Sequence, residues 1–416
     1  MAPSSLQDAA PVVVVGAGQG GLQVAASLRE GGFAGPVTVV DTEPGLPYQR
    51  PPLSKAFLTD DGGRSRIELR SAAFFDEHGI GLRTGTGVVA IDRTAGKVAL
   101  EQGEFLDYGH LVLATGATPR ALPVPGADQA GVVVLRTLAD ATTLRGLLRG
   151  PARRVVIVGG GFIGLEVAAV AAKLGHQVTI VEVLPRLMAR VASPELAAHV
   201  AEVHRDHGTE IVFGRCVVAL RGAGGAVRAV ELDDGTLLDA DVVLVGIGAV
   251  PKTDLAVRAG LDVDNGVVVD GRLRTSDPAI SAIGDCANYP SHHAGRRTRL
   301  ESVQNAVDQA RHVAARIITG SDEPYRAVPW FWTNQFDLRV QMVGIPQDQD
   351  ERVVHGDQVT GRFSVFRFHD GRLNTVESVN RAPDHVGARK LLATDLRPTA
   401  EQVRRAAFKL DPRNFS

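Results

Sequence analysis

Two glycine-rich segments of this sequence have the residue types and spacing needed to hold a phosphate group. They read GAGQGG from residue 16 and GGGFIG from residue 159. In such loops the first glycine permits a tight turn, the second leaves room for a pyrophosphate against bare backbone, and the third lets a helix pack closely on a strand. The glycines concerned are Gly16, Gly18 and Gly21 in the first segment and Gly159, Gly161 and Gly164 in the second.

An acidic residue follows each glycine segment at the distance typical of ribose binding, about twenty residues further along the chain. These acidic residues are Asp41 and Glu182. A carboxylate at this place can accept hydrogen bonds from the hydroxyl groups of a ribose. Two complete sets predict two nucleotide cofactors, as in a protein that passes a hydride between a nicotinamide and a bound flavin.

Buried strands and helices must hold these loops in place. Continuous valine runs at Val12–Val15 and Val155–Val158 predict parallel strands covered on both faces. An alanine-rich helix should follow each loop, and its N-terminus would face the phosphate. The next strands, at Val37–Val40 and Val178–Val181, end at the two acids. One glycine motif alone is weak evidence, but this whole unit occurs twice.

Glu182 also bears on the choice between NADH and NADPH. A 2′-phosphate about 4 Å from its carboxylate would cost up to roughly 4 kcal/mol at an effective dielectric near 20. NADH is therefore favoured. Arg186 and Arg190 follow Glu182 in the sequence and could offset part of this repulsion. We predict that Arg190 is one of the cofactor-binding residues. An exposed helix face explains the two arginines equally well.

Composition excludes several classes of protein. The 416 residues, 44% of them hydrophobic, suffice for two or three domains. The net charge of −2 predicts no affinity for nucleic acid, and no segment approaches the roughly 20 apolar residues that would cross a membrane. The only cysteines, Cys216 and Cys286, form no closely spaced pair, which excludes a dithiol mechanism. We expect a cytoplasmic protein without a metal site.

Two further buried strands predict how the chain is divided into domains. Residues 111–116 and 242–248 each form an apolar run that ends in glycine, and we interpret them as chain crossings between two α/β domains. The first domain would comprise residues 1–117 and 247–325, the second 118–246 as an insertion, and a C-terminal α+β domain 326–416. A strand at residues 280–283 should enter a helix, with Asp285 at the turn binding a ribityl hydroxyl or capping the helix.

The segment PYQRPPLSK, residues 47–55, places two cations at defined positions. Its prolines predict an extended path that does not become helix. A positioned Lys55 could stabilise the negative charge of a reduced flavin. A solvated proline-rich loop is the alternative interpretation of the same residues.

Taken together, the motifs resemble those of FAD-dependent, NADH-oxidising ferredoxin reductases of bacterial oxygenase systems. This is the rubredoxin, putidaredoxin and biphenyl dioxygenase reductase family, which has a glutathione-reductase-like fold. The motifs that carry the resemblance run from about Val12 to about Phe408, and they are YQRPPLSK, LATGATPR, GGGFIGLE, VGIGAVP, GDCA, RLESVQNA and PWFWTNQFDLRVQ. The resemblance implies two Rossmann-like domains, the NAD domain inserted in the FAD domain, and an α+β C-terminal domain.

The resemblance also implies roles for individual residues. Gly16, Gly18, Gly21 and Asp41 would bind the ADP half of FAD, with Asp41 standing where most members have Glu. The remaining FAD-lining positions would be Arg50, Lys55, Val88, Arg136, Asp285 and Val303. The NADH side would consist of Gly161, Ile163, Gly164, Glu182 and Gly248.

Three residues would act at the reacting rings. Glu166 would lie near the nicotinamide and close to Lys55, each holding the other charged. Trp332 would lie beside the flavin and nicotinamide, where its aromatic face can stack and exclude water; core packing is the alternative. The resemblance implies electron transfer, one electron at a time, to a [2Fe–2S] ferredoxin that serves a cytochrome P450 or a ring-hydroxylating oxygenase.

Basic residues would then dock the acidic ferredoxin. Arg311 and Arg339 are the main candidates, accompanied by Arg296, Arg297, Arg299 and Lys390. Other readings of the same fold are a reductase of monodehydroascorbate, a nitrite reductase flavin domain, which the lack of iron–sulfur cysteines disfavours, and an NADH-sensing flavoprotein of the apoptosis-inducing-factor type.

Overall fold

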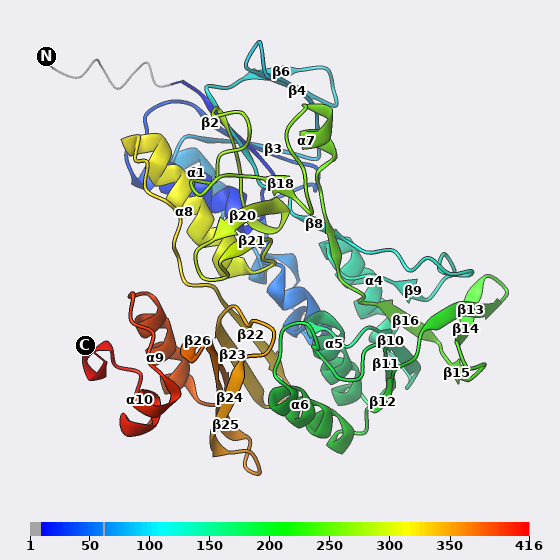
Figure 1. The fold of residues 1–416 in the computed structure, drawn as a ribbon. Coiled ribbons are helices and arrows are strands. Elements are labelled where there is room, and N and C mark those ends of the chain that lie inside the picture. Colours follow the sequence, from blue (N-terminus) through cyan, green and yellow to red (C-terminus); the bar gives the residue numbers. More distant parts are fainter. Residues whose placement is uncertain (1–9, 61–62, 416) are drawn as a thin grey trace, which may run out of the picture. The chain divides into compact units, whose positions relative to one another are not determined.

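The computed structural model describes residues 10–60 and 63–415, which form two compact units (Figure 1). Unit 1 consists of the described parts of Met1–Gln49, Arg64–Thr118 and Val250–Pro329, and unit 2 consists of those of Arg50–Gly63, Pro119–Ala249 and Trp330–Ser416. The chain therefore passes between the units near the two expected crossings. The division into three domains stays a prediction.

Unit 1 is built on a five-stranded parallel sheet with strand order β19-β7-β1-β2-β3. Its central strand β1 pairs in parallel with β2 and β7. The valine run of β1 is wholly buried, as the uninterrupted apolar pattern predicts. It shares one hydrophobic core with residues of helices α1 (Gln19–Glu30) and α8 (Val303–Thr319) and of strand β5 (Lys97–Leu100). The strands are β1 (Val12–Val15), β2 (Val37–Asp41), β3 (Ile80–Thr84), β7 (His110–Leu113) and β19 (Ile280–Ala282).

Two smaller three-stranded sheets and four α-helices complete unit 1. The sheets are β4 (Val88–Asp92), β5 (Lys97–Leu100) and β6 (Phe105–Asp107), and β18 (Val267–Val268), β20 (Ala287–Ser291) and β21 (Arg296–Thr298). The helices are α1 (Gln19–Glu30), α3 (Ala72–Glu77), α7 (Asp254–Arg258) and α8 (Val303–Thr319), with 3-10 turns at Arg64–Arg66 and Gly284–Cys286. Helices α1 and α8 pack against each other (Figure 1).

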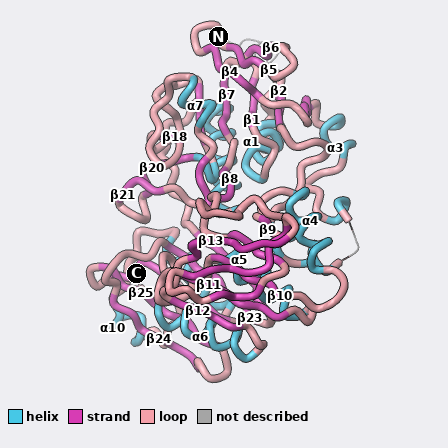
Figure 2. Tube along the Cα trace, turned by 90° about the vertical axis from the view of Figure 1, so that its right-hand side faces the viewer, coloured by secondary structure: helices cyan, strands magenta, loops and turns pink. Residues whose placement is uncertain are grey.

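Unit 2 repeats the parallel design with strand order β12-β11-β10-β16-β9. Figure 2 shows the strands in magenta. The strands are β9 (Val132–Val133), β10 (Arg154–Val158), β11 (Gln177–Glu182), β12 (Glu210–Phe213) and β16 (Val242–Val245). An antiparallel sheet of β13 (Val217–Ala223), β14 (Ala226–Leu232) and β15 (Leu237–Asp239) accompanies it, and the helices are α2 (Ala56–Thr59), α4 (Leu138–Leu148), α5 (Phe162–Lys173) and α6 (Pro194–Asp206).

The C-terminal part of unit 2 is a five-stranded antiparallel sheet with order β22-β23-β26-β25-β24. Its elements are β22 (Trp330–Gln335), β23 (Leu338–Gly344), β24 (Glu351–Asp357), β25 (Arg362–His369), β26 (Arg372–Val379), α9 (Ala382–Leu392), α10 (Ala400–Arg405) and a 3-10 turn at Pro412–Asn414. One hydrophobic core contains residues of both the parallel and the antiparallel sheet of unit 2. Strands β8 (Ala117–Pro119) and β17 (Ala249–Pro251) run across the boundaries between the units. The predicted α/β fold with an α+β C-terminal part is confirmed.

Two local predictions are wrong. Residues Pro51–Ser54 form a 3-10 turn rather than an extended path, with prolines in its first turn. Proline fits there because the first N–H groups of a helix need no intrahelical acceptor. After Ala282 the chain makes the 3-10 turn Gly284–Cys286 and continues as strand β20, not as a helix. Pro290 disfavours helical conformation in the residue before it, and β20 pairs with β21 instead.

His110 in β7 makes the stability of the fold depend on pH. Its Nε2 lies 3.0 Å from Ser281 Oγ and 3.4 Å from an Arg316 guanidinium nitrogen. Burial, followed by the charge of Arg316, lowers the pKa of His110 to about 3. The unfolded chain therefore binds a proton below about pH 6.5 that the folded protein does not bind.

Acid should accordingly destabilise the protein through this histidine. Between pH 6 and pH 4 the free energy of unfolding should fall by up to about 1.4 kcal/mol per pH unit from this group alone. A His110→Gln variant should show a shallower decline, measured by urea unfolding at several pH values. His292→Gln, at an exposed histidine, is the control and should leave the decline unchanged. Equal slopes for the two variants would contradict this assignment.

Candidate functional site

The first glycine of each loop is required by the turn that it makes. Gly16 and Gly159 both adopt a φ of +106°, a conformation that side chains disfavour. A Cβ on Gly16 would overlap the carbonyl of Ala114, and one on Gly159 would overlap that of Gly246. Both carbonyls follow the strand neighbouring the loop, β7 in unit 1 and β16 in unit 2. The two loops therefore have the same backbone geometry.

The other two glycines differ in what surrounds them. A Cβ on Gly18 or Gly161 would meet no atom within 4 Å, whereas one on Gly21 or Gly164 would overlap the carbonyl oxygen of the first glycine of its own loop. Gly18 and Gly161 are the N-cap residues of α1 and α5, and neither helix has a side-chain cap. Open space thus lies beside uncapped N–H groups, which is the arrangement that binds phosphate. The loops fit the pyrophosphates of two dinucleotides.

The two acids bond to the backbone in the same way. Asp41 accepts hydrogen bonds from the N–H groups of Ala17 at 2.5 Å and Glu43 at 2.7 Å. Glu182 accepts from the N–H groups of Gly160 at 2.7 Å and Leu184 at 2.8 Å. Each carboxylate therefore lies against its own glycine loop with lone pairs left for further donors. The repeat seen in the sequence extends to these contacts.

Lys55 and Glu166 form an ion pair within unit 2. Lys55 Nζ lies 2.6 Å from Glu166 Oε2, and the two side chains are 24% and 3% exposed. Glu166 lies on α5, two residues after Gly164, and Lys55 follows the 3-10 turn Pro51–Ser54, which packs on α5. The helix that begins at the second glycine loop therefore also holds the partner of Lys55.

Two residues that sequence reasoning did not identify complete this cluster. Ser54 Oγ donates to Glu166 Oε2 at 2.5 Å, and Thr333 Oγ1 donates to Glu166 Oε1 at 2.7 Å. Both hydroxyl residues are buried. Ser54 and Thr333 lie inside the motifs YQRPPLSK and FWTNQFD, but nothing in the motifs shows that the two meet at one carboxylate. With three donors around it, Glu166 is held as a fixed anion.

The predicted FAD-lining residues are divided between the units. In unit 2, an Arg50 guanidinium nitrogen donates to the carbonyl oxygen of Arg136 at 2.6 Å, so the fold brings these two together. In unit 1, Val88 begins β4, Asp285 lies in the 3-10 turn, and Val303 is the first residue of α8. Helix α8 contacts that turn, and Gly284 N–H donates to Gln309 Oε1 at 2.7 Å. The helix that contacts this turn is therefore α8, which Ser302 caps.

Trp332 lies on the opposite face of β22 from Thr333, because side chains alternate along a strand. Its ring is centred 5.4 Å from that of Trp330, which lies 5.3 Å from the His385 ring and under the Arg389 guanidinium. The face that carries Thr333 instead packs on α5, where the rings of Phe331 and Phe162 are 4.3 Å apart. The structure thus brings Trp332 to a second aromatic cluster and not to the Glu166 carboxylate.

The remaining nucleotide-binding candidates surround the second glycine loop. Ile163, on the first turn of α5, is 42% exposed although apolar. Gly248 has a φ of +106°, and a Cβ there would lie 3.5 Å from the Arg190 guanidinium. The guanidinium of Arg186 is hydrogen-bonded within the fold, donating to the carbonyls of Ala192 and Ala189 at 2.6 and 2.7 Å. Arg190 is exposed at the surface.

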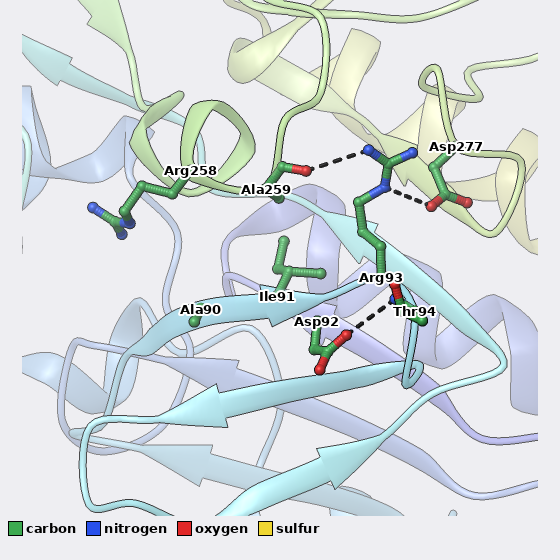
Figure 3. Close-up of a pocket in the computed structure, with 8 residues that line it drawn as sticks. All are labelled: Ala90, Ile91, Asp92, Arg93, Thr94, Arg258, Ala259 and Asp277. Atoms are coloured by element: carbon green, nitrogen blue, oxygen red, sulfur yellow. Dashed lines mark hydrogen bonds and ion pairs between the residues drawn. The ribbon is translucent and has the colours of Figure 1, made fainter.

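A groove in unit 1 is separate from these residues (Figure 3). It has a volume of about 640 Å³ and is lined by Ala90, Ile91, Asp92, Arg93, Thr94, Arg258, Ala259 and Asp277. Arg93 Nε donates to Asp277 Oδ2 at 2.8 Å, and its Nη1 donates to the carbonyls of Ala259 and Gly260 at 3.3 Å. These bonds join the turn after β4 to the end of α7 and to Asp277. None of the predicted site residues lines the groove.

Glu182 should control the choice between NADH and NADPH. We expect Glu182→Gln, which keeps one acceptor oxygen for the loop, to lower the ratio of kcat/KM for NADH to that for NADPH at least about tenfold, because the repulsion of a 2′-phosphate is removed. Steady-state kinetics with ferricyanide as acceptor measures this ratio. Glu210→Gln, at an acid on the neighbouring strand β12, is the control. A ratio unchanged in Glu182→Gln would remove Glu182 from nucleotide selection.

Comparison with known proteins agrees with this geometry. The family model described as pyridine nucleotide-disulphide oxidoreductase matches residues 10–310, and the model described as reductase C-terminal matches residues 330–412. Rhodocoxin reductase of Rhodococcus erythropolis is 48% identical over 399 residues, covering 96% of this chain and 93% of that protein.

Two solved structures are similar over nearly the whole chain. The ferredoxin reductase for the CYP199A2 system from Rhodopseudomonas palustris has a TM-score of 0.93 and 44% identity, covering 96% of this chain and 98% of that one. The reductase in the covalent putidaredoxin reductase–putidaredoxin complex has a TM-score of 0.92 and 38% identity, covering 96% and 97%. The doubled glycine loops, their acids and these matches place the chain in the pyridine nucleotide-disulphide oxidoreductase family.

Proposed function

We propose that this protein is an FAD-dependent NADH:ferredoxin oxidoreductase that passes electrons from NADH through FAD, one at a time, to a [2Fe–2S] ferredoxin. The observation that carries the proposal is that one chain has two dinucleotide-binding loops, each with its acidic residue, and no redox-active cysteine pair. Whole-length similarity to rhodocoxin reductase and to the ferredoxin reductase of the CYP199A2 system supports it.

Each cofactor has residues suited to hold it. FAD would be bound by Gly16, Gly18, Gly21 and Asp41, with Arg50, Lys55, Val88, Arg136, Asp285 and Val303 along the rest of the molecule. NADH would be bound by Gly161, Ile163, Gly164, Glu182, Arg190 and Gly248. The guanidinium of Arg186 already donates to two backbone carbonyls, which leaves the repulsion between Glu182 and a 2′-phosphate in place and supports NADH over NADPH.

Lys55 would act on the charge that develops during the reaction. FAD, when bound, would supply the chemistry that joins a two-electron hydride donor to a one-electron acceptor. The ammonium of Lys55, partly exposed and held by Glu166, would offer preorganised positive charge to the reduced ring. Glu166 accepts hydrogen bonds from Ser54 and Thr333 and pairs with Lys55, so it would fix Lys55 rather than transfer a proton. Trp332 would contribute an aromatic face that excludes water.

The electrons must leave to an external acceptor. Cys216 is exposed, Cys286 is buried, both are free, and they belong to different units. Arg311 on α8, with a side chain 60% exposed, and Arg339 on β23 are the proposed docking residues for an acidic ferredoxin. Two of the other arginines are engaged within the fold, since Arg297 donates to the carbonyls of Val269 and Asn288 and Arg299 pairs with Glu301.

The ferredoxin would feed a cytochrome P450 or a ring-hydroxylating oxygenase. A cytoplasmic location is part of the proposal and is supported by the two free cysteines. Across residues 10–60 and 63–415, none of the helices has the length and apolarity to cross a membrane.

Rapid mixing tests the proposal. The protein is reduced anaerobically with NADH and then mixed with a [2Fe–2S] ferredoxin encoded near its gene, while flavin absorbance is followed. We expect reoxidation much faster than the background oxidase rate, slowed by Arg311→Glu and by raised salt. A persistent charge-transfer band that is indifferent to ferredoxin would instead indicate an NADH sensor.

A further inference from the structure

A buried chain of hydrogen bonds continues from the Glu166 carboxylate into the core of unit 2. Thr333 Oγ1, which donates to Glu166 Oε1, accepts a hydrogen bond from Gln335 Nε2 at 3.2 Å. Gln335 Oε1 in turn lies 3.0 Å from His204 Nε2 on α6. Thr333 and His204 have no exposed surface, and Gln335 is 1% exposed. This chain of hydrogen bonds therefore links β22 and α6 to Glu166 on α5 and to its ion-pair partner Lys55.

The direction of each hydrogen bond follows from the carboxylate at its end. Glu166, paired with the Lys55 ammonium, can only accept, so the Thr333 hydroxyl hydrogen points to it and the Thr333 lone pairs accept from Gln335. The Gln335 amide then presents its oxygen to His204, whose Nε2 must carry the hydrogen. Burial lowers the pKa of His204, which favours this neutral ring. Within the described chain, its Nδ1 has no hydrogen-bond partner.

We propose that Thr333, Gln335 and His204 are positioning residues that hold the Glu166 carboxylate, and through it the Lys55 ammonium, in one orientation for hydride transfer. The inference rests on the proposed function, because it takes Lys55 to lie at the flavin. Every donor of the chain points toward Glu166, so the chain applies a positive potential at Oε1 without adding a charge. The carboxylate is thereby prevented from rotating, and the flexible lysine, which also donates to the Pro51 carbonyl at 3.2 Å, has a fixed anionic partner.

Burial explains why the arrangement is more than packing. Polar groups at three buried positions cost desolvation that apolar side chains of similar size would avoid. The orientation of these groups toward Glu166 is explained if the buried carboxylate has to stay charged and to keep one orientation. Glu166 could not satisfy both oxygens from Ser54 and Lys55 alone, since these two donors meet Oε2.

The decisive variant is Thr333→Val, which removes the hydroxyl and keeps the shape. In stopped-flow reduction of the FAD-loaded protein we expect the limiting rate with NADH to fall about tenfold, corresponding to the loss of one hydrogen bond to a charged group. The Kd for NADH should change less than about twofold. The midpoint potential of the flavin, measured by dye equilibration, should also fall. Thr333→Ser should restore all three values.

The matched control is Thr375→Val, which removes another fully buried threonine hydroxyl from the same sheet on β26. It should leave the reduction rate and the potential unchanged. If Thr333→Val and Thr375→Val behave alike, or if serine does not rescue, the positioning role is overturned. Should Thr333→Val fold poorly, Thr333→Ser and Gln335→Met, compared by the same measurements, decide the question.

A measurement that needs no cofactor, the tautomer of His204, tests the direction of the hydrogen bonds. In protein labelled with ¹⁵N-histidine, with His204 assigned through a His204→Gln variant, the ring should be the neutral tautomer protonated at Nε2 at pH 7. An Nδ1-protonated or charged ring would overturn the proposed chain. If wild-type protein reduces no ferredoxin but Thr333→Val still alters reduction by NADH, the proposed function fails while the positioning role stands.

Discussion

Replacing Lys55 by methionine should slow flavin reduction by NADH about 100-fold, which makes it one of the two largest effects that the structure predicts. Removal of a single preorganised stabilising group typically costs two to three orders of magnitude in rate. The substitution also leaves Glu166, whose side chain is 3% exposed, without its countercharge. Breaking a buried ion pair by removing one partner costs about 3 kcal/mol of stability.

Two further variants separate these two consequences. Lys55→Met combined with Glu166→Gln should recover most of the lost stability, because no unpaired charge remains, but it should not recover the rate. Lys97→Met removes a lysine whose ion pair with Asp107 is exposed, and it should change neither quantity. Stopped-flow absorbance gives the rate and thermal unfolding gives the stability. A normal reduction rate in Lys55→Met would remove this residue from the mechanism.

Alanine at Gly18 or Gly161 should strongly weaken the binding of one cofactor and leave the other bound. Gly18 and Gly161 have φ values of −66° and −86° with extended ψ, a conformation that alanine adopts readily. Their Cβ atoms would meet no protein atom, so the fold should be preserved. The methyl group would instead occupy the space left for the pyrophosphate. Gly18→Ala should purify largely without FAD, and Gly161→Ala should keep FAD but bind NADH about 100-fold more weakly.

The chain supplies matched controls for this experiment. Gly146 in α4 also has open space around its Cβ position, and Gly146→Ala should leave both cofactors bound while raising helix stability by up to about 1 kcal/mol. Gly21→Ala would overlap the Gly16 carbonyl and should disrupt the fold itself. The flavin-to-protein absorbance ratio and an NADH titration measure the outcomes. Stoichiometric FAD in Gly18→Ala would refute the assignment of the first glycine loop to FAD.

Features that depend on residues close together in the sequence could be predicted from the sequence alone. The valine runs form β1 and lie within β10, because apolar residues on both faces can only be covered inside a parallel sheet. The glycine positions were equally predictable, since a tight turn and close helix packing act over a few residues. The acids at the ends of β2 and β11 followed from the same repeating unit.

Contacts between distant segments were decided by the tertiary structure. Glu166 is 112 residues from Ser54 and 167 residues from Thr333, so no local pattern indicates that these groups share one carboxylate. The choice of a 3-10 turn at Pro51–Ser54 likewise reflects packing on α5 as well as local preference. The sequence by itself determined two nucleotide-binding glycine loops with their acidic residues, and it predicts that Lys55 acts at a flavin. Only the fold decided which groups hold that lysine, because hydrogen bonds between distant residues form when packing brings them within about 3 Å.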